Sequence, residues 1–577
     1  MKHDTVQIMI YGKNISNAEI YPQHGPSEIV GVHKAESPNF LFLDLSISPV
    51  ITESYNFEIG FSMGNTDTVI SYPILVRENS DNQFKGFNQS DVMYLIMADR
   101  FCDGNTANNN IGDSLDQFSS NDLNGRKGGD IEGIISKLDY LKDLGVTSIW
   151  ITPMLENNMW MSYHGYAATD LYKIDPRFGN NELYKTLVST VHAKGLKIVM
   201  DHVSNHIGLN HWWMKDLPFA NWINGTVEHH LPADHNKMTF PDPYSPGESV
   251  DLTRDGWFTD YMPDLNQADP FLKKYLIQNT IWWIEYSGLD GIREDTYPYC
   301  NQYAMADWAK EILDEYPNLN VVGEVWTGEP SYLAAYQQKN KFGIHLNTYL
   351  PCVTDFALSD ALRNYLSGKK GLEAIFNTLT QDFLYYDPNN LLTFFDNHDI
   401  SRGMFVANGD LEKYKIALTI LLTTRGIPTI FYGTEIGIIG TDHHGAIRSP
   451  FPGGFKGDTL NAFSECDRAD YQNNIFDFTQ NLLDIRKNYK SFSNGKLIHY
   501  YPFDGVYVYF REFENESTMV IVNSNSNDFE VDLNNYKETL SGTISIKNLK
   551  TNNVTDISNN KKINIKKKSA EIFLLIK

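Results

Sequence analysis

The chain has 577 residues, 42% of them apolar and 21% charged, and carries a formal net charge of -24 at pH 7. This length is too great for one compact core, and the composition is typical of a globular protein with two to four domains. The negative charge argues against a nucleic acid or an anionic membrane as partner and suits a neutral ligand. Aromatic residues reach 13%, which is compatible with a sugar ligand, although large aromatic cores explain much of the excess and are the better explanation for any single residue.

The cysteines and the start of the chain bear on the compartment. The four cysteines fit neither a metal spacing nor a dense disulfide framework, so we expect free thiols in a reducing compartment. No apolar run has the length of a membrane helix, and the first residues lead into a strand pattern without a signal peptide. We therefore expect a cytoplasmic protein, or a periplasmic one if a leader has been removed.

Residues 1–88 are expected to form an N-terminal β-sandwich. Short apolar runs at 6–10, 40–45, 55–59 and 69–70 are separated by turn residues rich in Gly and Asn. Short strands at this spacing, with turns between them, are typical of a small sandwich.

From Val92 the pattern changes to alternating strands and helices, which predicts an α/β fold, a (β/α)8 TIM barrel, over residues 89–490. Helices are expected at 131–144, 182–194 and 270–287, the last with Pro270 at its first position. The predicted strands lie at 92–97, 146–152, 196–201, 289–295, 321–324, 344–350, 391–395 and 428–432.

Two further parts complete the predicted organisation. About 85 residues separate Asp201 from Leu289, more than a loop and a helix need, so an inserted subdomain is expected at about 207–260. Apolar strands return at 506–510 and 519–522 and predict a C-terminal β-sandwich over 491–577.

Polar groups follow several of the predicted barrel strands. Arg293 and Asp295 are two residues apart, so on a strand they share a face, and the guanidinium is expected to lower the pKa of Asp295. An ionised, oriented carboxylate is what a covalent glycosidase uses as its nucleophile. Taken alone, an Arg-x-Asp pair is more often a surface ion pair. Acids at the ends of other buried strands, Glu324 and Asp399, favour the catalytic interpretation because the active face of such a barrel lies there.

These segments together resemble the motifs of the α-amylase superfamily, glycoside hydrolase family 13. The resemblance lies in residues 201–206, 291–295, 324 and 397–399, in their order and their strand positions. The segment 262–266 (MPDLN) is similar to an extra motif of the neopullulanase and cyclomaltodextrinase group, which also has a β-domain before the barrel. The resemblance covers nearly the whole chain.

The resemblance implies roles for the three acids. Asp295 would be the nucleophile and Glu324 the acid/base, while Asp399 would hold substrate hydroxyls and favour ring distortion. Glu324 has no cation beside it in the sequence and follows apolar residues, so its pKa is expected to exceed that of Asp295. Glu294 is expected to point away from the cleft and to need a partner there.

The resemblance also implies a set of substrate-binding residues. Tyr166 would stack beneath the sugar, the histidines would bond its hydroxyls, and one arginine would lie near the nucleophile. A lone histidine is more often structural, but two histidines beside three acids favour the binding role. Trp326 would face the acceptor side or pack in the core. The predicted set is Arg293, His206, His398, Tyr166, His164, Arg402 and Trp326.

A second oxygen-rich segment precedes the first barrel helix. By composition it is a polar, Asn-rich turn, whereas the resemblance implies a structural Ca²⁺, which binds six to eight oxygens. The predicted ligands are Asp103, Asn105, Asn108, Asn109, Gly128 and Asp130.

The resulting expectation is a retaining hydrolase of α-1,4-glucosidic bonds in cyclomaltodextrins and short maltodextrins, with pullulan left open. The alternatives are an α-amylase or oligo-α-glucosidase, and a non-catalytic glycan-binding protein on the same fold, which the intact acids disfavour. A homo-oligomer and glycan binding by the N-terminal domain are left open.

Overall fold

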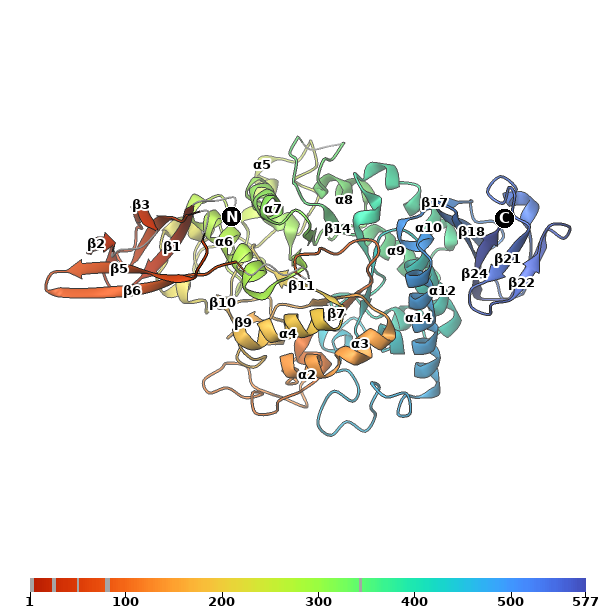
Figure 1. Cartoon of the computed structure of the whole chain (residues 1–577), viewed down its shortest axis with the longest axis horizontal. Coiled ribbons are helices and arrows are strands. Elements are labelled where there is room, and N and C mark those ends of the chain that lie inside the picture. The colour runs from red at the N-terminus through yellow and green to blue at the C-terminus, as the bar shows by residue number, and fades with distance from the viewer. Residues whose placement is uncertain (1–4, 23–26, 49–50, 78–82, 342–344) are drawn as a thin grey trace.

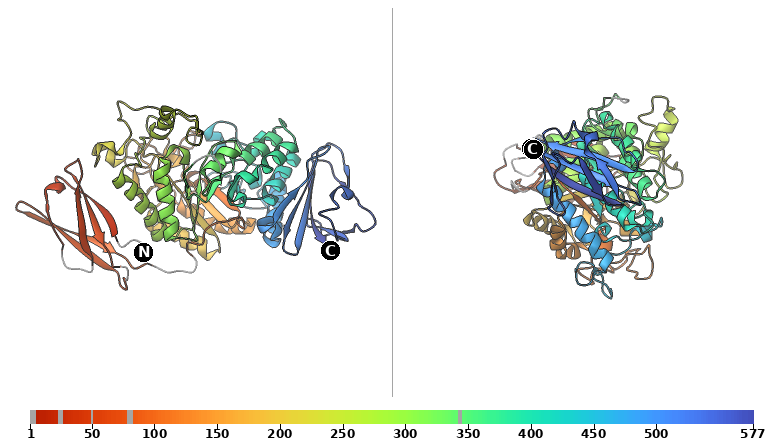
Figure 2. Two further views of the ribbon diagram at one scale, coloured as in Figure 1. Left: turned by 90° about the horizontal axis from the view of Figure 1, so that it is seen from above. Right: turned by 90° about the vertical axis from the view of Figure 1, so that its right-hand side faces the viewer.

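The computed structural model describes residues 5–22, 27–48, 51–77, 83–341 and 345–577. The molecule is elongated: the N-terminal strands lie at one end, the C-terminal strands at the other, and the barrel with its helices lies between them (Figures 1 and 2). The first and the last described strands therefore belong to separate sheets on opposite sides of the central domain.

The centre is a closed eight-stranded barrel in which every neighbouring pair is parallel, which confirms the predicted TIM barrel. Most of its residues are buried, as expected for parallel strands covered on both faces. The strands are β7 (Met93–Ile96), β8 (Ser148–Ile151), β11 (Lys197–His202), β12 (Gly291–Glu294), β13 (Asn320–Gly323), β14 (Cys352–Thr354), β15 (Leu391–Thr393) and β16 (Ile427–Phe431).

The sixth barrel strand was predicted at the wrong place. Ile344, at the start of the predicted strand, lies outside the described residues, and residues 345–350 form no strand. Tyr349 has a φ of 54°, a left-handed conformation that interrupts an extended run. The strand is instead β14, where Cys352 pairs with Val322 and Val353 pairs with Leu391.

The barrel helices begin and end at residues that explain their bounds. In α6 (Pro270–Ser287) the Asp269 side chain accepts from two backbone N–H groups of the first turn, and Gly288 ends the helix with a φ of 84°. The predicted helix at 131–144 is divided at Lys137 into two. The helices that follow the barrel strands or pack around them include α2 (Ile131–Ser136), α3 (Leu138–Leu144), α4 (Asn181–Ala193), α7 (Gln302–Glu315), α8 (Pro330–Tyr336), α9 (Phe356–Leu366), α10 (Leu372–Leu379), α12 (Leu411–Thr423) and α14 (Asp470–Asn488).

The N-terminal part has two three-stranded sheets, β1-β4-β3 and β2-β5-β6, with a core of their own. The side chains of Phe40 and Phe42, on β4, belong to the main core rather than to this one and contact Trp212 and Phe219 of the segment after β11, which joins the sheet to the barrel domain. Its strands are β1 (Thr5–Tyr11), β2 (Glu19–Pro22), β3 (Glu28–Lys34), β4 (Phe40–Ser46), β5 (Tyr55–Met63) and β6 (Thr66–Ile74).

The C-terminal part has a six-stranded sheet, β17-β18-β19-β24-β21-β22, and a two-stranded sheet, β20-β23. The strands are β17 (Lys496–His499), β18 (Val506–Phe513), β19 (Glu516–Asn523), β20 (Phe529–Asp532), β21 (Ser545–Asn548), β22 (Val554–Asp556), β23 (Lys562–Ile565) and β24 (Ser569–Ile576).

The long segment between β11 and α6 forms the short helices η3 (Trp212–Lys215), η4 (Ala220–Trp222) and α5 (Gly247–Asp255). Trp213, Trp222 and Trp257 are fully buried, so these rings pack the segment rather than offer a sugar surface. Within the described ranges, none of the helices is both long and apolar enough to span a bilayer.

Candidate active site

One arginine holds three carboxylates at the C-terminal ends of adjacent barrel strands. The Nη1 atom of Arg293 lies 2.5 Å from Oδ1 of Asp295 and 2.8 Å from Oδ1 of Asp201, and its Nη2 lies 3.1 Å from Oε2 of Glu324. The guanidinium is 1% exposed. Because β11, β12 and β13 are neighbours in register, the side chains at their ends converge on one point. The structure thus brings Asp295 and Glu324 together as predicted.

The predicted difference in pKa between these two acids is wrong. Burial raises the pKa of Asp295 to about 7, and Arg293 opposes this rise without cancelling it. Burial likewise raises the pKa of Glu324 to about 7, and the same Arg293 opposes it. Glu324 does have a cation beside it, supplied by the neighbouring strand. Two adjacent carboxyls of this kind titrate as a pair, and near neutral pH they hold about one proton between them.

Thr296 orients Glu324. It follows Asp295 directly and has a φ of 44°, a left-handed conformation that is costly for a β-branched residue. Its backbone N–H donates to Oε2 of Glu324 over 3.1 Å. The strained turn after the strand therefore aims a donor at the second acid, a contact that the sequence pattern did not reveal.

Asp399 is paired with an arginine that the sequence analysis missed. Arg448 donates to Oδ1 of Asp399 over 2.7 Å and to the backbone carbonyl of His398 over 2.7 Å. Burial acts to raise the pKa of Asp399, but His398, Arg448 and Arg293 outweigh it and lower the pKa to about 2. This acid is ionised throughout the neutral range, whereas the Asp295–Glu324 pair is not fully ionised.

A tyrosine and histidines form the wall beside Asp399. The hydroxyl of Tyr166 lies 2.9 Å from Oδ2 of Asp201 and 2.7 Å from Nε2 of His398, and the two rings stack with centroids 5.6 Å apart. His206 bonds the backbone carbonyl of Tyr166, and His164 accepts from its N–H. Burial lowers the pKa of His206 to about 4 and those of His164 and His398 to about 3, so they are neutral hydrogen-bonding groups at pH 7.

Arg402 does not belong to this site, contrary to the prediction. Its side chain is fully buried, donates to the backbone carbonyls of Tyr432 and Ile447, and stacks on Phe431 with 3.7 Å between guanidinium carbon and ring centroid. It braces the segment after β16 and is out of reach of a sugar. Trp326 is 40% exposed and stacks on Phe356 at 5.0 Å, so one face of its ring remains open.

Glu294 points away from the cleft as expected, and its partner is now identified. Its carboxylate lies 2.7 Å from Nδ1 of His202 and accepts from the backbone N–H of Ser204 over 2.7 Å. The other ring nitrogen of His202 contacts Thr280 on α6 at 3.1 Å. This buried pair fastens β12 to β11 and to α6.

The predicted metal loop contains buried oxygens without a partner. Oδ1 of Asp103, Asn108 and Asn109 each lack a hydrogen bond, while Nδ2 of Asn109 donates to the other oxygen of Asp103 over 2.9 Å. A Cβ on Gly128 would come within 2.4 Å of the Asn109 amide oxygen, so that side is closed to a larger residue. Orphaned carboxylate and amide oxygens fit the ligand preference of Ca²⁺.

Asn105 and Asp130 play a different part in that loop. Asp130 caps α2 and accepts from the N–H groups of Gly104, Asn105 and Gly133, and Asn105 bonds Ala107 and Glu132. These contacts shape the loop. Over the described ranges, no cluster of three or more His, Cys, Asp or Glu residues could hold a metal, so an ion here would depend on amide oxygens.

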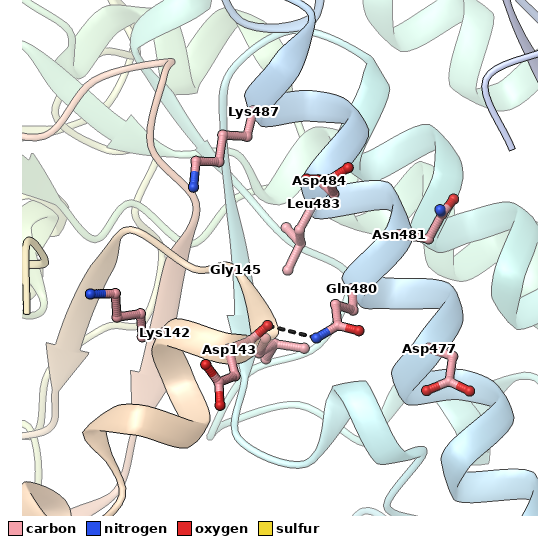
Figure 3. A pocket seen from close by; sticks show the side chains of 10 residues that line it. Lys142, Asp143, Gly145, Asp477, Gln480, Asn481, Leu483, Asp484 and Lys487 are labelled. Carbon is pink, nitrogen blue, oxygen red and sulfur yellow. Dashed lines mark hydrogen bonds between the residues drawn. The ribbon is translucent and has the colours of Figure 1, made fainter. Parts of the chain in front are cut away.

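A surface cavity of about 460 Å³ lies apart from these groups, between the end of α3 and one face of α14 (Figure 3). Gln480 donates to the backbone carbonyl of Asp143 across it, over 2.7 Å. Its lining comes from side chains of both signs, among them Lys142 and Asp484, and includes none of Asp295, Glu324 and Asp399.

The strand ends of this TIM barrel carry two carboxyls bound to one guanidinium, and a third acid lies beside neutral histidines. This arrangement is that of a barrel glycoside hydrolase. The chain belongs to the α-amylase family. Residues 95–452 match the family described as "Alpha amylase, catalytic domain". Residues 1–78 match "Cyclomaltodextrinase, N-terminal" and residues 497–573 match "Cyclo-malto-dextrinase C-terminal domain".

Individual relatives agree with this assignment. A cyclomaltodextrin glucanotransferase of Geobacillus stearothermophilus is 33% identical over 504 residues, which cover 83% of this chain and only 65% of that protein. A cyclomaltodextrinase of Thermoanaerobacter pseudethanolicus is 28% identical over 452 residues, 77% of this chain and 72% of that protein. The crystal structure of an Anoxybacillus α-amylase superposes with a TM-score of 0.71 at 28% identity, covering 84% of this chain and 98% of the other.

Proposed function

We propose that this protein is a retaining glycoside hydrolase that cleaves α-1,4-glucosidic bonds in cyclomaltodextrins and short maltodextrins. The observation that carries the proposal is the bridge from Arg293 to both Asp295 and Glu324. A retaining mechanism needs two carboxyl groups about 5 to 5.5 Å apart, closer than in enzymes that place water between them. Two carboxylates bound to one guanidinium are held close together, which supports the retaining route.

The chemistry follows from one shared proton near neutral pH. Protonated Glu324 gives its proton to the glycosidic oxygen as the bond to the anomeric carbon breaks, and the bonding electrons pass to that oxygen. Ionised Asp295 forms the new bond to the same carbon. Glu324, now ionised, takes a proton from water, whose oxygen displaces Asp295 and restores the starting state.

The wall beside Asp399 would hold the sugar that is attacked. Asp399 is an anion that accepts from hydroxyls, and His398, His206 and His164 are neutral donors or acceptors. The half-buried ring of Tyr166, whose hydroxyl bonds Asp201, would supply an aromatic contact for the apolar side of the sugar ring. Such contacts raise the rate to the extent that they strengthen in the transition state.

The preference for rings and short chains is supported by the terminal domains, whose matches carry the name cyclomaltodextrinase. The second candidate is an α-amylase acting on starch, which the similarity to the Anoxybacillus enzyme favours. Competition between β-cyclodextrin and soluble starch in one reaction separates them: we expect the ring to be consumed first. NMR of the first-formed product should show the α-anomer, and an initial β-anomer would reject the covalent route.

We further propose a structural Ca²⁺ in the loop of Asp103, Asn108 and Asn109. The three orphaned side-chain oxygens support it, and the ion would supply charge and rigidity to the loop before α2. No step of bond cleavage depends on it.

A further inference from the structure

The inserted segment between β11 and α6 reaches the mouth of the barrel through His235 and Lys237. The backbone carbonyl of Lys237 accepts from the hydroxyl of Tyr336 on α8 over 2.8 Å. Nδ1 of His235 lies 3.0 Å from the hydroxyl of Tyr299, in the short helix η5 (Tyr297–Tyr299) that follows the nucleophile strand. Contacts on two separate elements therefore fix this loop beside the catalytic acids.

The ammonium of Lys237 lies between two aromatic rings near Glu324. Its Nζ is 5.8 Å from the centroid of Tyr299 and 5.8 Å from that of Trp326. Trp326 follows Glu324 by two residues, so the ammonium is held close to the strand end that carries this acid. Burial lowers the pKa of Lys237, and the charge of Glu324 acts in the opposite direction. Among the described residues Lys237 has no carboxylate within salt-bridge distance.

The surroundings differ on the two sides of Glu324. On one side, Asp399 and the rings of Tyr166 and His398 form the wall for the sugar that is attacked. Lys237 and the open face of Trp326 form a second group, in which the ammonium lies 5.8 Å from the ring centroid and Trp326 is two residues after Glu324. The unit that leaves with the glycosidic oxygen is bound away from the wall that holds the attacked sugar, so the group of Lys237 and Trp326 is the candidate for contact with it.

We propose that Lys237 is a substrate-binding residue on the leaving-group side, where its ammonium donates to hydroxyls of the glucose unit released by Glu324. The inference rests on the proposed hydrolysis and names a residue for it on the inserted segment. An ammonium has three donors and no acceptor, and a glucose unit offers several hydroxyl oxygens. The same contact would hold an incoming sugar when the glycosyl group is transferred to it rather than to water.

The test compares two substrates in the full-length protein. Maltotriose places a glucose unit on the leaving-group side, whereas α-maltosyl fluoride releases fluoride and leaves that side empty. The variant Lys237→Met keeps most of the stem but removes the charge and the donors. We expect it to lower kcat/KM on maltotriose about tenfold or more, the loss of one charge-assisted hydrogen bond, and to change hydrolysis of the fluoride less than twofold.

Two further variants keep the test decisive. Lys413→Met is the matched control, because Nζ of Lys413 also lies 5.8 Å from a tyrosine ring, that of Tyr365, away from the acids. Lys413→Met should leave kcat/KM unchanged on both substrates. Lys237→Arg keeps the charge and should retain more of the maltotriose activity than Lys237→Met. With glucose added as acceptor to α-maltosyl fluoride, Lys237→Met should also lower the fraction of transfer product.

The outcomes separate this inference from the proposed function. Equal losses on both substrates, or no loss on either, would overturn the assignment of Lys237 while leaving glucan hydrolysis in place. A wild-type protein inactive on both substrates would overturn the proposed function and this inference with it.

Discussion

Replacement of Arg293 by methionine should move the acid limb of the pH–activity profile to higher pH. Arg293 is the cation that opposes the burial-driven rise in the pKa of Asp295, which already lies at about 7. A hydrogen bond to a charged group contributes roughly 1.5 to 3 kcal/mol, and about 1.4 kcal/mol corresponds to one pKa unit. Losing the 2.5 Å contact should therefore raise the pKa of Asp295 by about one to two units. At pH 7 its ionised fraction would fall from about one half to between one tenth and one hundredth.

The assay uses α-maltosyl fluoride, because fluoride leaves without a proton and the profile then reports the ionisation of the nucleophile. We expect the acid limb of kcat/KM to shift upward and activity to recover toward alkaline pH. Arg293→Lys, which keeps a charge, should shift the limb less. Arg402→Met is the matched control: it removes another fully buried arginine, and it should lower thermal stability without moving the limb.

A loss of activity that is uniform at every pH would refute the electrostatic reasoning. Arg293 would then act only by holding geometry, since it also binds Asp201 and Glu324. Melting curves of each variant show whether the fold is kept, because removal of one partner leaves buried carboxylates unpaired.

Three other outcomes are expected. Asp295→Asn and Glu324→Gln should each lower kcat on maltotriose about 10³-fold or more, and only Glu324→Gln should retain activity on α-maltosyl fluoride; normal activity of either variant on maltotriose would reject its role. Chelation with EDTA should lower Tm more than it lowers the rate at low temperature, Asn109→Ala should weaken this response, and an unchanged Tm with no metal by elemental analysis would remove the ion. Burial acts to lower the pKa of His202, but Glu294 outweighs it, so the net pKa is raised above the usual value. The pair therefore stabilises the fold fully below a pH of about 6.5, and this contribution is lost as the pH rises through the folded pKa. Glu294→Gln should then lower Tm more at pH 6 than at pH 9, and an equal loss at both would contradict the charged pair.

The barrel could be predicted from the sequence because its strands are buried on both faces. Such strands are nearly continuous apolar runs, and a polar residue at the end of one is conspicuous. That contrast identified Asp295, Glu324 and Asp399 and the outward direction of Glu294. The sixth strand was misplaced because only three residues, Cys352–Thr354, pair there, too few for a pattern.

Contacts made across the chain could not be read in the same way. Arg402 stands three residues after Asp399 and was predicted beside the acids, yet its side chain turns to carbonyls after β16. The cation beside Asp399 is instead Arg448, from a loop 49 positions after Asp399. Nearness in sequence was a poor guide because the loops after the strands fold back over one another. Lys237 comes from a third loop, which had no motif to mark it.

In the proposed mechanism, the different roles of Asp295 and Glu324 must come from their placement, because their pKa values do not separate them. Burial raises both to about 7, and one guanidinium touches both. What differs is the remaining environment. Asp295 shares Nη1 of Arg293 with Asp201, whereas Glu324 accepts the N–H of Thr296 and faces the side of Lys237. In the proposed reaction, a cation on that side would favour the ionised form of Glu324 after its proton has left with the glycosidic oxygen, and the pair would then be ready for water to release the sugar.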